Sequence, residues 1–346
     1  MGYTADILNN IRYNASPDYQ ERIPVATRTN ISTIGQAFED YDVLFNEFHE
    51  ALLNKIGKTI ISQAMFKNKL ARFKSGEVTS PHDVEEIFIG MAKAEGVYDP
   101  DGKNPLGRRR DDNVKVMYHR QNRQDYYAIS IGDIDFARTF RSEATLESFI
   151  KGKIASVYNA DARDEWLCMK ELFSSYRELE DPYASGFDFY FFVADTDKER
   201  YAVNFIKTLR KAVYDLSFLS SEHNAAHVEI QTDVNNLVLF VHKDVVVECD
   251  VERLATAFHQ SETDMKVVPT IIVMDDFGTE NKAGGVLNNC VAILADKEWF
   301  KVWDTKIHME PQRNAQGLFT NYFYHHHQIL SCSPFKNAVA IYEDKD

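Results

Sequence analysis

Apolar positions in the middle of the chain recur at the spacing of a helix. Between residues 145 and 180 they lie three or four apart, which places them on one helical face. The pattern predicts a spine helix over 145–180 that Ser142 or Thr145 caps and Asp181-Pro182 ends. About 35 residues span roughly 50 Å at 1.5 Å per residue. We therefore expect this helix to be a structural axis of the molecule.

The C-terminal half changes to the patterns of β-structure. Two long aromatic-rich strands with a turn near Asn314 precede Ser333-Pro334-Phe335 and one last strand. Upstream, the pattern predicts strands over 187–194, 237–241, 266–274 and 291–294, and helices over 198–219 and 251–260. We assign a chain with these helices and strands to the α+β class.

The N-terminal third predicts a different set of elements. Polar residues and two prolines indicate an extended arm up to about residue 33. Helical spacing predicts a helix over 38–74, and Pro81 predicts the start of a short helix that ends near Gly96. Alternation over 113–134 predicts a long two-stranded hairpin after a loop at 98–112. This hairpin is too polar to form a core, so we expect it to lie on another surface.

Composition narrows the classes of protein. The 346 residues carry a formal net charge of −14, which argues against a dedicated nucleic-acid binder but allows a protein that encloses nucleic acid without gripping it. The four cysteines are far apart, as expected for reduced thiols rather than for disulfides or a zinc site. With no visible signal peptide and no stretch of ~20 apolar residues, we expect a cytosol-made protein without a membrane span.

Candidate catalytic motifs lack their required companions. Asp275-Asp276-Phe277-Gly278 has the letters of a kinase metal-binding triplet, but no glycine-rich or catalytic loop accompanies it, so it indicates an acidic turn. In His325-His326-His327 only the first and third residues share a strand face, and no third ligand converges on them. We therefore expect no catalytic, cofactor or metal site, and no enzyme.

A group of basic residues lies at and near the predicted hairpin and marks a candidate contact with a neighbouring subunit. With Tyr126 the group consists of Arg108, Arg109, Arg110, Arg120 and Arg123. Contact with nucleic acid and a solvated loop are the alternatives. The net charge of −14 favours acidic patches of a neighbour over nucleic acid.

The order of these elements, with several short segments, resembles a known family. The segments are Val241-His242-Lys243-Asp244, 254–258, 267–274 with Phe277, 293–297, Asn314-Ala315-Gln316-Gly317 and Ser333-Pro334-Phe335. From about residue 105 to the end, the chain is similar to major capsid proteins of tailed bacteriophages with the Hong Kong 97-type fold. The resemblance implies an N-terminal arm and helical region over 1–104 and an extended β-hairpin loop over 105–142. It also implies a peripheral domain over 143–221 and 299–346 and an inserted α/β axial domain over 222–298.

The resemblance implies a shell protein that assembles with itself into pentamers and hexamers of an icosahedral or prolate head around double-stranded DNA. Scaffolding, portal and decoration proteins are further implied partners, and the virion, assembled in the host cytoplasm, is the implied location. A cellular nanocompartment shell of the same fold, a metal- or carboxylate-dependent hydrolase using His325 and His327 or Asp275 and Asp276, and a nucleic-acid-binding module remain alternatives.

Overall fold

The computed structural model divides the chain into two compact units, each with its own core. It describes residues 3–27, 29–40, 48, 66–78, 83–92, 114–132, 143–178, 188–195, 197–249, 270–278 and 290–344. The first unit comprises residues 1–68, 123–166 and 304–328. The second comprises residues 69–122, 167–303 and 329–346.

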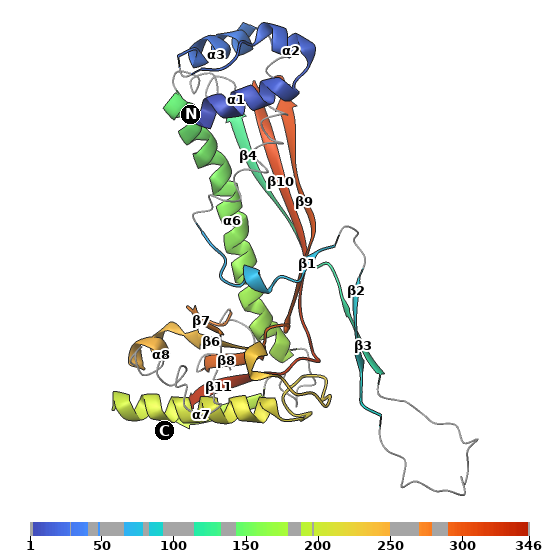
Figure 1. Ribbon diagram of the computed structural model, residues 1–346, viewed down its shortest axis with the longest axis vertical. Helices are drawn as coiled ribbons and strands as arrows, with labels where there is room; N and C mark the ends of the chain where they lie inside the picture. The colour runs from blue at the N-terminus through green and yellow to red at the C-terminus, as the bar shows by residue number, and fades with distance from the viewer. Residues whose placement is uncertain are drawn as a thin grey trace, which may run out of the picture. The chain divides into compact units, whose positions relative to one another are not determined.

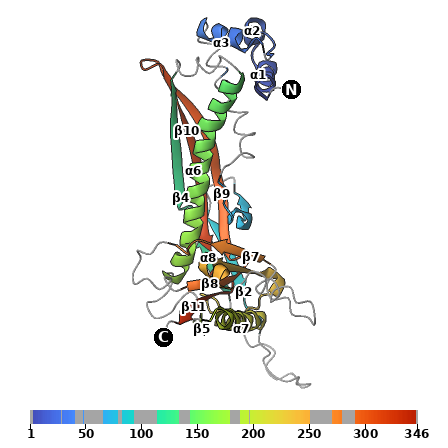
Figure 2. The same cartoon turned by 90° about the vertical axis from the view of Figure 1, so that its left-hand side faces the viewer.

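The first unit combines N-terminal helices, long strands and most of one long helix (Figure 1). Its elements are α1 (Tyr3–Asn14), α2 (Pro17–Arg22), α3 (Ile31–Asp40), β4 (Arg123–Gly132), and parts of α6 (Glu143–Glu178), β9 (Phe300–Asn314) and β10 (Phe319–Cys332). β4 and β10 pair antiparallel, from Phe319 opposite Gly132 to Gln328 opposite Arg123. They belong to a four-stranded sheet of order β1-β9-β10-β4, in which β1 is Gly76–Glu77. Within this unit α6 runs alongside β4 and β10 (Figure 2).

The second unit is built on a five-stranded sheet of order β5-β11-β8-β6-β7. Its strands are β5 (Asp188–Val193), β6 (Leu237–His242), β7 (Thr270–Met274), β8 (Cys290–Asp296) and β11 (Ala338–Asp344). The helices α7 (Lys198–Ser217) and α8 (Lys243–Glu248) bury one sheet face, where Leu239 and Ile341 pack against Phe205 and Leu209. Phe240 points to the opposite face and joins an aromatic cluster with Phe173 of α6 and Phe300.

A two-stranded sheet and two short 3₁₀ turns complete the second unit. β2 (Val84–Ile89) and β3 (Val114–His119) pair antiparallel, with Val84 opposite His119 and Ile89 opposite Val114. The 3₁₀ turns are η2 (Ala71–Phe73) and η3 (Val234–Asn236).

Most elements expected after residue 143 are confirmed. The predicted spine helix is α6, and β5, α7, β6, β7, β8, β9, β10 and β11 lie where the pattern placed strands and a helix. Thr145 lies inside α6, so it does not cap the helix. The short helix α8 was not expected, and the predicted helix over 251–260 lies outside the described residues.

The predicted N-terminal elements are wrong in type. Residues 3–22 form α1 and α2 instead of an extended arm, because the Ser16 hydroxyl accepts the amide of Tyr19 and Pro17 opens the following helix. Leu8 and Ile11 are buried in the core of the first unit. The predicted helix over 38–74 fails at 66–74, where only the η2 turn is helical, while 41–65, apart from Phe48, lies outside the described residues.

The short helix predicted from Pro81 is also wrong, because its described part is the strand β2. Residues 84–89 alternate between half-buried and exposed positions, as a strand does. Pro81 itself, and the loop expected at 98–112, lie outside the described residues.

The predicted hairpin over 113–134 has its strands in place but with different partners. β3 pairs with β2, and β4 pairs with β10. Between them the Asn122 side chain donates to the Leu330 carbonyl at 2.7 Å and accepts from the Leu330 amide at 2.9 Å. Asn122 thus ties the chain to β10 where it leaves β3. The described two-stranded sheet is therefore formed by residues 84–89 and 114–119.

The five-stranded sheet reaches beyond the predicted axial segment 222–298. β5 and β11, at residues 188–193 and 338–344, pair with each other, and β11 also pairs with β8. The compact α/β unit is therefore assembled from three parts of the chain.

Candidate functional site

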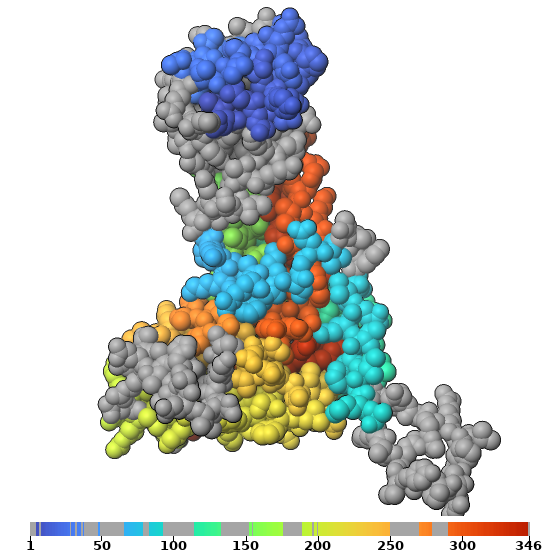
Figure 3. Space-filling model, in the orientation of Figure 1, coloured from blue at the N-terminus to red at the C-terminus, as the bar shows by residue number. Residues whose placement is uncertain are grey.

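One face of the β2–β3 sheet is apolar and exposed; we call it the apolar ribbon face. Directly paired residues point to the same side, so Ile87 lies beside Val116 and Ile89 beside Val114, followed by Tyr118. These five side chains are 43% to 69% exposed. β2 and β3 lie at the surface in Figure 3. The apolar ribbon face therefore offers a contiguous apolar surface to another molecule.

The opposite face of the same two strands is fastened to the second unit. Phe88 stacks on Phe335, with ring centroids 5.8 Å apart. Glu86 accepts from the Ser333 hydroxyl at 2.9 Å and pairs with Lys301 at 3.1 Å. Burial acts against ionisation of Glu86, but His119, Lys301 and Ser333 outweigh it and hold the pKa of this carboxyl below its usual value. The ribbon is thus anchored by one face and exposed by the other.

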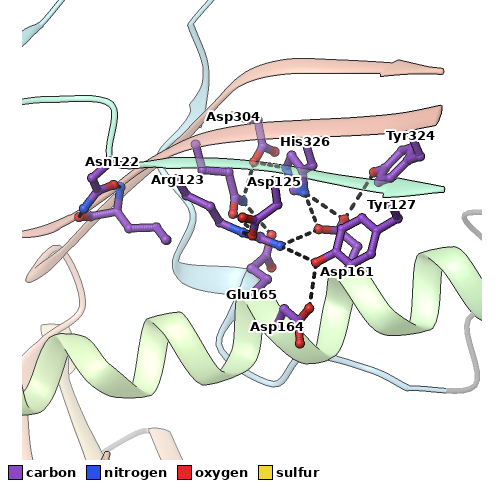
Figure 4. Close-up of polar contacts among 12 residues, drawn as sticks. Asn122, Arg123, Asp125, Tyr127, Asp161, Asp164, Glu165, Asp304, Tyr324 and His326 are labelled. Atoms are coloured by element: carbon purple, nitrogen blue, oxygen red, sulfur yellow. Dashed lines mark hydrogen bonds and ion pairs between the residues drawn. The ribbon is translucent and has the colours of Figure 1, made fainter. Parts of the chain in front are cut away.

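A second constellation lies inside the first unit, where charged side chains meet between α6 and the long strands; we call it the ionic clamp (Figure 4). α6 supplies Asp161 and Glu165, four residues apart and so on one helix face. β10 supplies His326 and Gln328, two residues apart on one strand face. β4 supplies Arg123, paired with Gln328 across the strands, and β9 supplies Asp304.

Arg123 and His326 are the two basic residues of the ionic clamp. The Arg123 guanidinium binds Asp161 at 2.7 Å, Asp125 at 2.6 Å and the Gln328 carbonyl oxygen at 2.5 Å. The His326 Nδ1 lies 2.7 Å from Asp161, and its Nε2 lies 3.0 Å from Asp304. Arg123 is 4% exposed and His326 is 3% exposed. Each of the two buried basic side chains therefore bridges two separate carboxylates.

Neutral donors complete the ionic clamp. The Gln328 amide donates to Glu165 at 2.7 Å and to Asp304 at 2.7 Å, and the Asn68 amide donates to Glu165 at 2.6 Å. The Tyr324 hydroxyl donates to Asp161 at 3.2 Å, and the Tyr127 hydroxyl donates to Asp164 at 2.8 Å. Buried charges require such partners, because an unpaired one costs several kcal/mol.

Electrostatics in the ionic clamp favour the charged forms. Burial opposes ionisation of Asp161, but the hydrogen bond and charge of His326, followed by Arg123, hold the pKa of Asp161 below its usual value. Burial likewise opposes protonation of His326, but Asp161 and Asp304 raise the pKa of this ring above its usual value. Burial is also the main cause of the raised pKa of Tyr324.

Glu165, Asp304 and His326 bring three potential metal-ligand atoms within 4.8 Å of one another. These atoms already face donors of the chain, since the Gln328 amide lies on both carboxylates and the His326 Nε2 lies on Asp304. A divalent cation would have to displace these donors beside the Arg123 guanidinium. The donor set therefore fits an ion-pair network and not a metal centre.

The residues predicted to contact a neighbouring subunit have different environments in the structure. Arg123 is 4% exposed and its guanidinium binds the buried Asp161, so the structure gives no support to its predicted contact with a neighbour. Arg120 is exposed and lies 3.1 Å from Asp83. Tyr126 is 64% exposed beside Phe323 and His325. Arg108, Arg109 and Arg110 lie outside the described residues.

The remaining residues that the sequence suggested as candidate ligands or catalytic groups contact other side chains of the same chain. Asp275 and Asp276 follow β7 and bind the Lys170 ammonium at 3.1 Å and 2.8 Å, and Gly278, with φ of 113°, closes the acidic turn. His325 and His327 share a strand face with ring centroids 6.2 Å apart. The sequence analysis did not identify His326 as part of a buried ion-pair network. The available signal was that alternate residues of a strand face opposite sides, so that His326 faces away from His325 and His327.

Two further expectations concern thiols and membranes. Cys249, Cys290 and Cys332 are buried thiols, and burial raises the pKa of Cys249 to about 11. Among the helices that the structure describes, none has the length and apolarity to cross a bilayer.

Solved structures with a similar fold define the class of protein. The capsid structure of Staphylococcus phage Andhra matches with a TM-score of 0.61 at 12% identity, over 81% of this chain and 85% of that one. A structure of bacteriophage P68 matches with a TM-score of 0.60 at 13% identity, over 81% and 85%. The α+β architecture is thus the Hong Kong 97-type fold of phage capsid subunits, which confirms the predicted fold class.

Sequence comparison identifies the family. The chain belongs to the Phi29-like phage major capsid protein family, which it matches over residues 8–342. The major capsid protein of Bacillus phage B103 is 32% identical over 99% of this chain and 73% of that protein. The major capsid protein of Streptococcus phage Cp-1 is 28% identical over 96% and 92%. The chain is accordingly a structural protein of the phage virion shell, which favours this role over the nanocompartment, hydrolase and nucleic-acid-binding alternatives.

Proposed function

We propose that copies of this chain form the pentamers and hexamers of an icosahedral or prolate head through the apolar ribbon face. The observation that carries this proposal is the exposure of Ile87, Ile89, Val114, Val116 and Tyr118 on one side of a sheet whose other side is anchored. A two-stranded sheet is marginal by itself, and an exposed apolar patch of this kind marks an interaction site. In a shell of identical subunits, the partner is a second copy.

The domain roles follow from the same proposal. The element at 84–119 takes the part of the extended loop that lies over a neighbouring subunit. α6 with β9 and β10 forms the peripheral domain, and the α/β unit around 222–298 meets its copies at the five- and six-fold axes. Arg120 and Tyr126 are exposed and available for contact with a neighbour. For Arg108, Arg109 and Arg110 the same role stays a prediction.

The enclosed double-stranded DNA needs no sequence-specific contact. The net charge of −14 supports a protein wall that surrounds the DNA, rather than a surface that binds the DNA by neutralising its phosphates. We propose no enzymatic activity for the chain, because His326 and the paired Asp275 and Asp276 are engaged in structural contacts. Scaffolding, portal and decoration proteins are proposed partners of the assembled shell.

The test is electron microscopy and size-exclusion chromatography of the variant Ile87→Gln/Val116→Gln. We expect it to fold, because both side chains are exposed, but to yield neither closed shells nor rings under conditions in which the wild type assembles. The matched control is Val203→Gln, which changes an apolar side chain of α7 that is 45% exposed and lies outside both the apolar ribbon face and the unit around 222–298. Normal shells from the double variant, with circular dichroism like that of the wild type, would contradict the role of the apolar ribbon face.

A further inference from the structure

His326 occupies an unusual position between two buried acids. Asp161 of α6 lies 2.7 Å from its Nδ1, and Asp304 of β9 lies 3.0 Å from its Nε2. A neutral imidazole carries one N–H and one bare nitrogen, so it can donate to only one of these carboxylates. Both contacts are hydrogen bonds only when the ring carries two protons.

The side chains around His326 are mostly acidic, so the second proton of the ring changes the charge balance of the ionic clamp. The titratable and charged side chains that surround it come from four elements: Asp161, Asp164, Glu165 and Tyr158 of α6; Asp304 of β9; Arg123, Asp125 and Tyr127 of β4; and Tyr324 of β10. Five of these are carboxyl groups and one is a guanidinium. A neutral His326 would leave the buried acids with less positive charge than they need.

We propose that His326 makes the ionic clamp a pH-sensitive latch between α6 and the long strands. The imidazolium bridges Asp161 and Asp304 at pH values below its pKa in the folded state. Loss of its second proton above that pKa leaves one carboxylate facing a nitrogen lone pair. The contact between α6 and the strands then weakens in each subunit of the shell at once.

The direction of the pH effect follows from the raised pKa of His326, which Asp161 and Asp304 cause against the opposing effect of burial. A raised pKa in the folded state adds stability that is fully present below the unfolded pKa of about 6.5. That stability is lost as the pH rises through the folded pKa. The latch therefore opens as the pH rises, and not as it falls.

The chain contains matched controls on both sides of His326. His325 and His327 lie on the same strand, but their side chains point to the other face and contact each other. Burial, together with the charge of Lys306, lowers the pKa of His327 below its usual value. A general property of this strand would shift the pKa values of His326 and His327 in the same direction, whereas these two pKa values shift in opposite directions.

The first experiment measures the protonation midpoint of each histidine in the full chain by hydrogen–deuterium exchange at the imidazole C2 carbon, read by mass spectrometry. We expect the midpoint of His326 to lie above those of His325 and His327, and to fall in the Asp304→Asn variant. A His326 midpoint at or below about 6.5, or one that does not move in Asp304→Asn, would overturn the proposal.

The second experiment compares unfolding of wild type, His326→Gln and His325→Gln between about pH 6 and pH 10. Glutamine retains one donor and cannot titrate. We expect wild type to lose its advantage over His326→Gln as the pH rises, with the ratio of their unfolding constants changing up to tenfold per pH unit. His325→Gln should follow the wild type throughout. A constant difference between wild type and His326→Gln at all pH values would refute the latch.

Discussion

The ionic clamp and the apolar ribbon face invert the usual distribution of side chains. In the first unit, Arg123, Asp161 and His326 are buried although they carry charge. In the second unit, Ile87 and Ile89 are exposed although they are apolar. Buried charges and exposed apolar patches are the placements that carry information about a protein, because ordinary folding avoids both.

The two regions differ in whether their side chains find partners within the same chain. Each charge of the ionic clamp finds its partner within one chain, through bonds of 2.5 to 3.2 Å. The apolar ribbon face has its anchor within the chain, on Phe335 and Ser333, but its outer side chains remain exposed. We infer that the ionic clamp defines the shape of the single subunit and that the ribbon face joins subunits.

The largest expected effect separates the two arginines that the sequence grouped together. Arg123→Met leaves Asp161 buried beside only part of its counter-charge, so we expect the free energy of unfolding to fall by about 3–5 kcal/mol. Arg120→Met should change it by about 0.5 kcal/mol or less, because the Arg120 side chain is 75% exposed. Urea denaturation at neutral pH measures both. Equal losses would mean that burial does not distinguish these residues.

A smaller effect separates the two faces of β2. Phe88→Ala removes the stacking on Phe335 and should lower the free energy of unfolding of the subunit by about 2 kcal/mol. Ile89→Ala should leave that free energy within about 0.5 kcal/mol but weaken association, because Ile89 is 69% exposed. Thermal unfolding of the subunit and sedimentation of assembled particles measure the two quantities. If Ile89→Ala destabilised the isolated subunit as much as Phe88→Ala, the two faces would not have different roles.

The smallest expected effect concerns a buried cation whose partners reach water. The Lys170 side chain is 4% exposed, but the side chains of Asp275 and Asp276 are 54% and 51% exposed. Lys170→Met should therefore cost only about 1 kcal/mol, since water can hydrate both aspartates after the change. Urea denaturation alongside Arg123→Met gives the comparison. If Lys170→Met lowered the free energy of unfolding as much as Arg123→Met, exposure of the partner carboxylates would not reduce the cost of losing the cation.

Long-period patterns allowed most of the fold to be predicted. The helical spacing over 145–180 matches α6 to within two residues at each end, because one uninterrupted apolar stripe decides a long helix. Short segments were ambiguous. Residues 84–89 fit both the spacing of a helix and the alternation of a strand, and they form a strand because they pair with β3. Pro17 suggested an extended arm but opens α2, since a proline fits the first turn of a helix.

The candidate sites were less predictable than the fold. Asp161 and Glu165 stand four residues apart on a helix, which was a visible signal that they share a face. Nothing local indicated that His326 and Asp304 would meet them, because 22 or more residues separate these partners along the chain. Arg123 looked like part of an exposed basic group for the same reason.

The sequence by itself determined the long helix and the C-terminal strands, since these depend on periodicity and on the order of elements, and its resemblance to a known family implied the fold class and the role of a capsid subunit. Only the tertiary structure decided which strand pairs with β3, which arginine is buried and which of three adjacent histidines lies between two acids. Periodicity is a property of neighbouring residues, whereas burial and ion pairing depend on contacts between residues far apart along the chain.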